Sequence, residues 1–215
     1  MEEITRRRLL RIGIGAAAGV AVLGGAGYAA AWAPEPELIH TTMGAGMKTA
    51  LVVYGTGTGC TEEIAERIAR TLSERGLKVE LAPAAEAPDP AGFDAVLVGS
   101  GVRAGSWHTP VREWVAKYAA ALKANEVAFF TVGLTLGTDP GKTAEVRAYT
   151  DTLIAETGVT PVDIGLFAGM NEPKRFSFLE RTVMKLMKSP EGDFRDWDKI
   201  EAWAGESVDT LGLAG

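Results

Sequence analysis

Residues 50–64, which read ALVVYGTGTGCTEEI, combine a strand pattern, a loop of alternating glycine and threonine, and the first turn of a helix. The continuous apolar run before Gly55 is typical of a strand covered on both faces. Glycine lets a ligand approach the backbone closely, and threonine hydroxyls donate hydrogen bonds. The following helix directs its unpaired N–H groups and positive dipole end at the loop. This combination predicts an anion site, with phosphate as the anion.

The loop lacks the features of two common nucleotide-binding motifs. A P-loop requires Lys and then Ser or Thr after its last glycine, whereas Cys60 and Thr61 follow Gly59. A dinucleotide loop requires Gly-x-Gly-x-x-Gly, and neither Gly55 nor Gly57 begins that spacing. The loop itself contains no cation. We therefore expect backbone N–H groups and threonine hydroxyls to hold a single phosphate monoester.

The loop from Gly55 to Glu62 resembles the FMN-phosphate loop of flavodoxins, in which Thr-x-Thr-Gly-x-Thr holds the 5′-phosphate. The match runs from Thr56 to Thr61 and includes the flanking strand and helix. The resemblance implies FMN as the cofactor. The alternative is an ordinary glycine-rich turn between a strand and a helix, which would not need three threonines.

From Met47 onward, strand and helix patterns alternate. The expected strands cover residues 49–54, 77–81, 93–100, 126–132 and 161–168, and the expected helices cover 61–75, 109–124 and 141–156, before a helical tail. This order predicts an α/β fold: a flavodoxin-like three-layer α/β/α arrangement with a five-stranded parallel sheet of order 2-1-3-4-5. The charged positions of 77–81 favour an edge strand. Ligands bind such sheets beyond the carboxyl ends of strands 1 and 3.

The loop after the third strand, residues 99–108, combines small residues with one cation and one large aromatic. Trp107 either stacks on a flavin ring or packs on the next helix. Arg103 either steadies negative charge near N1 and O2 of the reduced ring, binds a substrate carboxylate, or is solvated. His108 is either a helix-start residue or a proton donor. Arg103 and His108 are thus the candidates for catalysis.

The loop after the fourth strand, residues 131–139, is mainly apolar and predicts a dry wall for the flavin or for an apolar substrate. In it, Gly133 would permit main-chain contact with the pyrimidine edge of the ring. No loop holds a Ser-His-Asp set, paired catalytic carboxylates or a metal site, which disfavours hydrolysis. The residues expected to bind the cofactor are Thr56, Gly57, Thr58, Gly59, Cys60, Thr61, Ser100, Gly101, Val102, Arg103, Gly105, Trp107, Thr131, Val132, Gly133 and Leu134.

The chain begins with a cluster of four arginines before a charge-free run over residues 12–33, about the length that spans a bilayer. The cluster resembles a twin-arginine export signal, with Leu9 and Arg11 in place of the usual Phe and Lys. We expect residues 1–33 to be a retained anchor or a cleaved signal, with the rest of the chain on the extracytoplasmic face. A buried helix of a soluble protein is the alternative. Residues 34–46 would form a linker and 47–215 the FMN-binding domain.

Charge and cysteine content narrow the function. Residues 34–215 carry 18 basic and 26 acidic side chains, a net charge of −8, which disfavours nucleic-acid binding. The single cysteine, Cys60, excludes an internal disulfide and a cysteine-rich metal site.

The C-terminal tail resembles one branch of the flavodoxin fold. Residues 172–188 form a basic and aromatic segment, and Asp196-Trp197 precedes the last expected helix. This pattern, with residues 98–105, is similar to the quinone-dependent, FMN-containing protoporphyrinogen dehydrogenases of haem synthesis. The resemblance covers about residues 47–204. It departs from the family in a shorter insertion after the basic segment, in a more flavodoxin-like phosphate loop and in the N-terminal run.

Residues 174–188 also predict an amphipathic helix. One face carries apolar side chains, from Phe176, Leu179, Val183, Leu186 and Met187, and another face carries basic ones. The helix either covers the sheet with a solvated basic face, or contacts anionic lipid or porphyrin carboxylates.

These features together predict an FMN-dependent oxidoreductase on a membrane. The resemblance implies dehydrogenation of a porphyrinogen-type substrate with delivery of electrons to a membrane quinone. The alternatives are a tethered flavodoxin that only carries electrons between redox proteins, and a binding domain without flavin.

Overall fold

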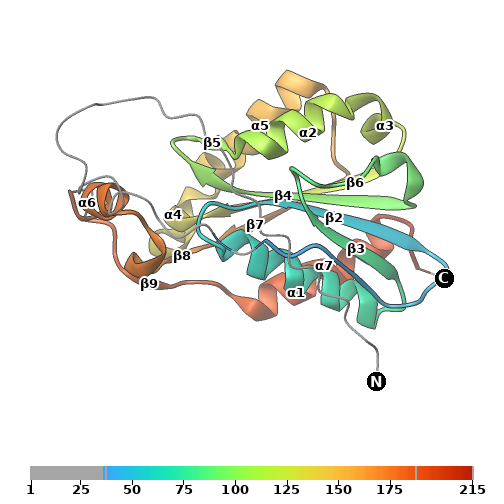
Figure 1. Ribbon diagram of the computed structural model, residues 1–215, viewed down its shortest axis with the longest axis horizontal. Helices are drawn as coiled ribbons and strands as arrows, with labels where there is room; N and C mark the ends of the chain where they lie inside the picture. The colour runs from blue at the N-terminus through green and yellow to red at the C-terminus, as the bar shows by residue number, and fades with distance from the viewer. Residues whose placement is uncertain (1–35, 37, 187, 215) are drawn as a thin grey trace, which may run out of the picture.

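The computed structural model describes residues 36, 38–186 and 188–214, and its ribbon shows three layers (Figure 1). The expected N-terminal anchor or signal lies outside these residues. Within them, no helix combines the length and the apolar character needed to cross a bilayer.

The central layer is a sheet of order β1-β3-β2-β4-β6-β7. Its strands are β1 (Thr41–Met43), β2 (Thr49–Gly55), β3 (Lys78–Pro83), β4 (Ala95–Arg103), β6 (Glu126–Gly133) and β7 (Asp163–Ala168). The five strands from β3 to β7 are parallel and follow the predicted order 2-1-3-4-5, so this part of the prediction is confirmed.

The prediction that residues 77–81 form the sheet edge is wrong. Strand β1, from the expected linker, pairs antiparallel with β3, with Thr41 opposite Leu81. One of the charged side chains of β3 that suggested an edge has a partner here, because His40 Nε2 lies 3.0 Å from Glu80 Oε1.

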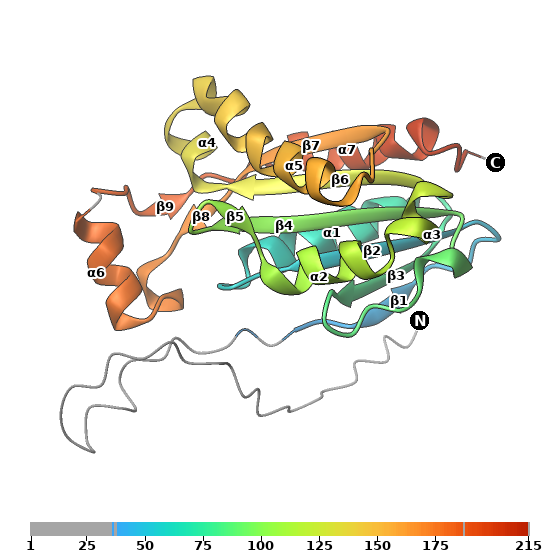
Figure 2. The ribbon, with the colours of Figure 1, turned by 90° about the horizontal axis from the view of Figure 1, so that it is seen from above.

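Helices cover both faces of the sheet (Figures 1 and 2). The helices α1 (Cys60–Glu74) and α7 (Trp197–Thr210) lie on one face; α2 (Thr109–Lys117), α3 (Ala119–Lys123) and α5 (Thr143–Thr157) lie on the other. Strand β2 shows the reason: Ala50, Val52 and Tyr54 face the first pair, while Leu51 and Val53 face the second group. An apolar residue at every position is what a strand buried on both faces requires.

Three predicted elements differ in detail. The helix expected over 109–124 is two pieces, α2 and α3. The loop expected over 131–139 contains a short helix, α4 (Leu134–Thr138). The helix expected over 174–188 is shorter: a single 3-10 turn (Pro173–Arg175) precedes α6 (Phe178–Leu186). Two short pairs complete the fold: β5 (Ser106–Trp107) on β4, and β8 (Met170–Asn171) with β9 (Gly192–Asp193).

We predict that Gly99→Ala strongly destabilises the fold. A Cβ at this position of β4 would lie 1.9 Å from Phe130 Cζ, and Phe130 is fully buried on the neighbouring strand β6. Forcing a methyl group into a packed core costs about 3 kcal/mol. Urea unfolding of the full chain measures the change in free energy. Gly92→Ala is the matched control, because a Cβ there has open space around it. Equal stability of the two variants would contradict the prediction.

Candidate functional site

The glycine-threonine loop ends in an uncapped helix N-terminus. Gly59, the residue before α1, has φ 82° and no side chain caps the helix. The first N–H groups of a helix have no partner within it. Those of Cys60, Thr61 and Glu62 are therefore donors available to an anion.

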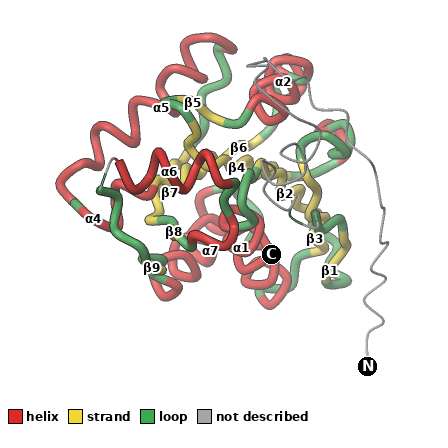
Figure 3. Tube along the Cα trace, turned by 60° about the vertical axis from the view of Figure 1, so that its left-hand side comes forward, coloured by secondary structure: helices red, strands yellow, loops and turns green. Residues whose placement is uncertain are grey.

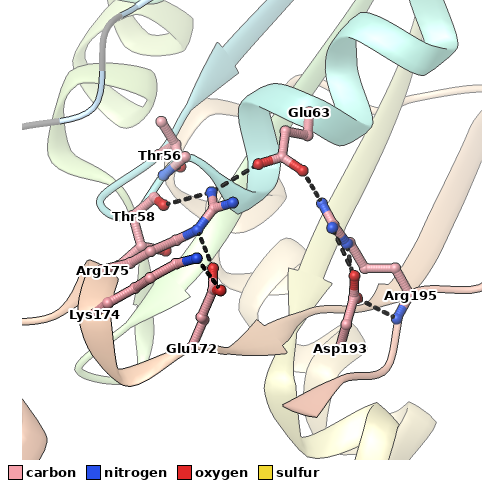
Figure 4. Close-up of polar contacts among 9 residues, drawn as sticks. Thr56, Thr58, Glu63, Glu172, Lys174, Arg175, Asp193 and Arg195 are labelled. Carbon is pink, nitrogen blue, oxygen red and sulfur yellow. Dashed lines mark hydrogen bonds and ion pairs between the residues drawn. The ribbon is translucent and has the colours of Figure 1, made fainter.

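The peptide between Thr58 and Gly59 is fixed at both ends. Its N–H, on Gly59, donates to Thr56 Oγ1 at 2.9 Å, and its carbonyl, on Thr58, accepts from Arg175 Nη1 at 3.3 Å. Because a trans peptide is planar with N–H and C=O on opposite sides, these two bonds set the orientation of the plane. Figure 4 shows Arg175 reaching the loop. The loop geometry is thus held by a residue 117 positions away in the sequence.

Arg175 belongs to a charge cluster centred on Glu63 of α1 (Figure 4). Glu63 accepts from Arg175 at 2.7 Å and from Arg195 at 2.6 Å. Although burial alone would raise it, these two guanidinium groups lower the pKa of Glu63. The cluster is completed by ion pairs of Glu172 with Lys174 and Arg175 and of Asp193 with Arg195. Three carboxylates thus balance three cations, so the loop is held firmly without excess charge.

The tail, residues 169–197, contacts all three predicted site loops. Besides Arg175 on the glycine-threonine loop, Glu180 of α6 pairs with Arg103, the last residue of β4. A Cβ on Gly137 of α4 would lie 2.3 Å from the Cβ of Phe194, so the tail packs there as well. In Figure 3, α6 lies in front of the strands, at the end of the sheet where the loops gather.

Arg103 and His108 lie together beside Gly57. A Cβ on Gly57 would lie 3.1 Å from His108 Nε2 and 3.2 Å from Arg103 Nη1. Burial, and after it the charge of Arg103, lowers the pKa of His108, so its ring is neutral at pH 7. The two candidate catalytic residues therefore border the phosphate loop, one charged and one neutral.

Trp107 is buried in the core, and the prediction that it stacks on a flavin is wrong. Ala104 and Gly105, with φ 49° and 77°, form a tight turn that folds β5 back on β4. This turn buries Trp107 in the core, where it is 2% exposed and packs edge-to-face on Phe129. Its Nε1 donates to Thr131 Oγ1 at 3.1 Å. The alternative for Trp107 was packing on the following helix, and Trp107 does belong to one core cluster with Val111 and Val115 of α2.

Other predicted site residues direct their side chains inward. The Thr131 hydroxyl lies 2.7 Å from that of Thr150, and Val132 belongs to the core. The Ser100 hydroxyl accepts from the His108 N–H and donates to the Gly101 carbonyl. The Cys60 thiol is buried, which raises its pKa. From these residues, only main-chain groups are available to a ligand.

The remaining predicted residues lie where the loops meet. A Cβ on Gly101 would lie 2.9 Å from Thr61 Oγ1, so the loops after β2 and β4 are in close contact there. Gly133 ends β6 and Leu134 begins α4, at the same end of the sheet. Val102 pairs with Trp107 in the hairpin whose turn contains Gly105.

Sequence reasoning missed Arg175 as a neighbour of the phosphate loop. Its signal was the basic run at residues 174–175, for which the sequence left open a solvated face or contact with lipid or porphyrin. Sequence reasoning also missed a buried polar group behind the loop. There, the Tyr54 hydroxyl lies 3.1 Å from Glu62 Oε2 and 3.0 Å from the Ile39 carbonyl, and it accepts from the Ile39 N–H at 2.7 Å.

The hydrogen bonds around the Tyr54 hydroxyl are satisfied best when Glu62 is protonated and therefore neutral. The Tyr54 hydroxyl has one proton for two acceptors, so a protonated Glu62 can donate to it while it donates to Ile39. Burial raises the pKa of Glu62 to about 7, although its hydrogen bonds act in the opposite direction. Burial, and then the charge of Glu62, also raises the pKa of Tyr54.

We predict that stability falls as Glu62 ionises. Its folded pKa lies above its ordinary value, so the native state keeps the proton to higher pH than the unfolded chain does. The stabilisation is complete below about pH 4.5 and is lost as the pH rises to about 7. Over this pH range, the free energy of unfolding of the unchanged chain should fall by about 3 kcal/mol relative to that of Glu62→Gln. Urea unfolding at several pH values measures it.

Glu74→Gln, at the other end of α1, is the matched control and should keep the pH profile of the unchanged chain. Parallel profiles for the unchanged chain and Glu62→Gln would show that folding does not raise the pKa of Glu62, which would contradict the prediction.

The chain is similar to several known proteins. The family model for the flavodoxin domain matches residues 51–198. The protoporphyrinogen IX dehydrogenase (quinone) of Escherichia coli K12 is 28% identical over 171 residues, covering 74% of this chain and 94% of that protein. The enzyme of the same name from Leishmania major is 26% identical over 168 residues, covering 73% of each. Flavodoxin 1 of Bacillus cereus is a distant structural likeness, with 15% identity, a TM-score of 0.48, and coverage of 75% of this chain and 98% of that one.

The resemblance to flavodoxins and to the named dehydrogenases is thereby confirmed. The donors at the start of α1 are those that a phosphate monoester requires, since they are main-chain N–H groups aligned with the helix dipole. The family model covers most of the chain, so the protein belongs to the flavodoxin domain family and is a flavodoxin-like oxidoreductase that binds FMN.

Proposed function

We propose that the protein oxidises a porphyrinogen-type substrate and passes the electrons to a quinone. The observation that supports this most is the similarity to protoporphyrinogen IX dehydrogenases over 94% of the length of the Escherichia coli protein. Each pair of electrons and protons lost by the porphyrinogen would convert one quinone to a quinol. FMN, when bound, supplies the chemistry, because it accepts a hydride or single electrons.

The phosphate of FMN would be held by the main-chain N–H groups of Cys60, Thr61 and Glu62 and by the hydroxyl of Thr58. Thr56 would act indirectly, since its hydroxyl accepts from the Gly59 N–H. Arg175 would be a positioning residue: it fixes the carbonyl of Thr58 and so the loop from which the donors project.

Arg103 and His108 would serve the reacting end of the site. Arg103 offers a positive charge to a carboxylate of the substrate or to negative charge on the reduced cofactor. His108 has a lowered pKa and is neutral, so it is free to accept a proton released by the substrate. The charge-free run over residues 12–33 would anchor the chain, with the domain on the extracytoplasmic face.

We predict that Arg175→Met weakens binding of FMN and leaves riboflavin, which lacks the phosphate, unaffected. Loss of a charge-assisted hydrogen bond of this kind costs roughly 10- to 100-fold in affinity. Glu63 keeps Arg195 and Glu172 keeps Lys174 in this variant, so the cluster retains a partner for each carboxylate. Quenching of flavin fluorescence measures both affinities.

Lys174→Met is the matched control, because Lys174 is the exposed neighbour that pairs only with Glu172 among the described residues. Its FMN affinity should stay within about twofold of the unchanged chain. An equal loss of FMN and riboflavin binding in Arg175→Met would contradict a role at the phosphate.

We predict that the purified full chain is yellow and that, without oxygen, it converts protoporphyrinogen to porphyrin only when menaquinone is added. Porphyrin fluorescence measures the product. Reversible reduction by a redox protein with no porphyrin formed would favour the electron-carrier alternative. A colourless protein that does not take up FMN would contradict the cofactor itself.

A further inference from the structure

Helix α6 exposes an unusual amount of apolar surface. Phe178, Leu179, Val183 and Leu186 are 72%, 68%, 45% and 79% exposed. They make up most of the large hydrophobic side chains that are exposed among the described residues. A concentration of this kind on one element of a soluble domain marks an interaction site rather than ordinary surface.

These side chains form one face. At 100° per residue, Phe178, Leu179, Val183 and Leu186 fall within about 140° of the helix circumference, with Thr182 between them. The opposite side is tied to the body of the protein: Glu180 pairs with Arg103, and Met184 lines a small pocket with Asn171 and Phe176. Phe176, expected on the apolar face, lies before the helix and belongs to that inner side. In Figures 1 and 2, α6 stands apart from the three layers, at one end of the sheet.

Basic side chains lie along one edge of the apolar face and just beyond the end of the helix. Arg181, Lys185 and Lys188 are exposed, and none has a carboxylate within ion-pair distance among the described residues. The one acidic residue of α6, Glu180, is neutralised by Arg103. The remainder of the domain is acidic, since residues 34–215 carry a net charge of −8. Positive charge is therefore concentrated beside the exposed apolar face, whereas the domain as a whole carries a net negative charge.

We propose that α6 docks on the surface of an anionic lipid membrane, with its four apolar side chains among the acyl chains and its basic side chains at the headgroups. An amphipathic helix with aromatic and aliphatic residues on one face and Lys or Arg beside them is the element that binds this interface. The positive potential of the flank matches anionic lipid, which each basic residue favours separately. This contact is distinct from the anchor expected over residues 12–33.

The docked orientation would bring the predicted flavin site to the membrane. The inner side of α6 contacts Arg103, and the 3-10 turn before it contacts the glycine-threonine loop. A lipid-soluble quinone would then reach the site from the bilayer. This use of the surface rests on the proposed function, whereas the docking itself rests on exposure and charge.

A local probe on α6 tests the docking in the full chain, whatever holds the N-terminal segment. Thr182→Cys places a thiol in the centre of the face without removing an apolar side chain, and the native Cys60 is buried. An environment-sensitive fluorophore on this thiol should shift to the blue with phosphatidylcholine vesicles that contain phosphatidylglycerol, and much less with phosphatidylcholine alone. The same label on Val162→Cys, an exposed position on another element, should not shift.

Two sets of variants separate the contributions. Replacing Lys185 and Lys188 by Gln should raise the concentration of anionic lipid needed for half of the shift at least about tenfold. Phe178→Ser with Leu186→Ser should abolish the shift while leaving the unfolding temperature unchanged, because both side chains are exposed. Val162→Ser with Met47→Ser, two exposed apolar residues elsewhere, is the matched control and should change nothing.

No shift at position 182 while the chain sediments with the vesicles would overturn the proposal. So would a shift without vesicles that grows with protein concentration, because a second copy would then cover the face. A shift of equal size on neutral vesicles would overturn the role of anionic lipid. The measurement needs neither substrate nor quinone, so its failure and the failure of the proposed enzyme activity are distinguishable.

Discussion

The carboxylate of Glu63 joins the helix that follows the phosphate loop to the C-terminal tail. It lies in the first turn of α1 and accepts hydrogen bonds from Arg175 and Arg195 of the tail. The side chain of Arg195 is only 6% exposed and stacks on Trp197, the first residue of α7. A charge buried to this extent needs its partners, because an unpaired buried ion is costly. The phosphate loop, the tail and the last helix are therefore held as one unit.

The order of the parallel strands was predictable because β2, β4 and β6 are apolar on both faces, and a right-handed crossover leaves few arrangements for such strands. The added strand β1 was not predictable. Three residues, Thr41 to Met43, carry no clear strand pattern. They form a strand because they pair with the otherwise free edge of β3.

The three predicted loops lie at one end of the sheet, but the directions of several of their side chains were not predicted. Trp107 and Thr131 occur at the ends of strands next to glycine, where a ligand contact and a core contact have the same sequence pattern. The two positive φ angles at Ala104 and Gly105 decide the matter, since they fold the hairpin and turn Trp107 inward. Arg175 illustrates the converse: its role depends on a contact across 117 positions, which no local pattern encodes.

Strand β1 and Ile39 also determine where the folded domain begins. A chain that started at Met47 would leave the outer hydrogen-bonding groups of β3 unpaired, and an open strand edge of this kind pairs readily with other copies. It would also remove the main-chain groups of Ile39 from the buried hydroxyl of Tyr54, directly behind the phosphate loop. The segment between the expected anchor and the first parallel strand is thus a protective border of the sheet, and its loss favours aggregation.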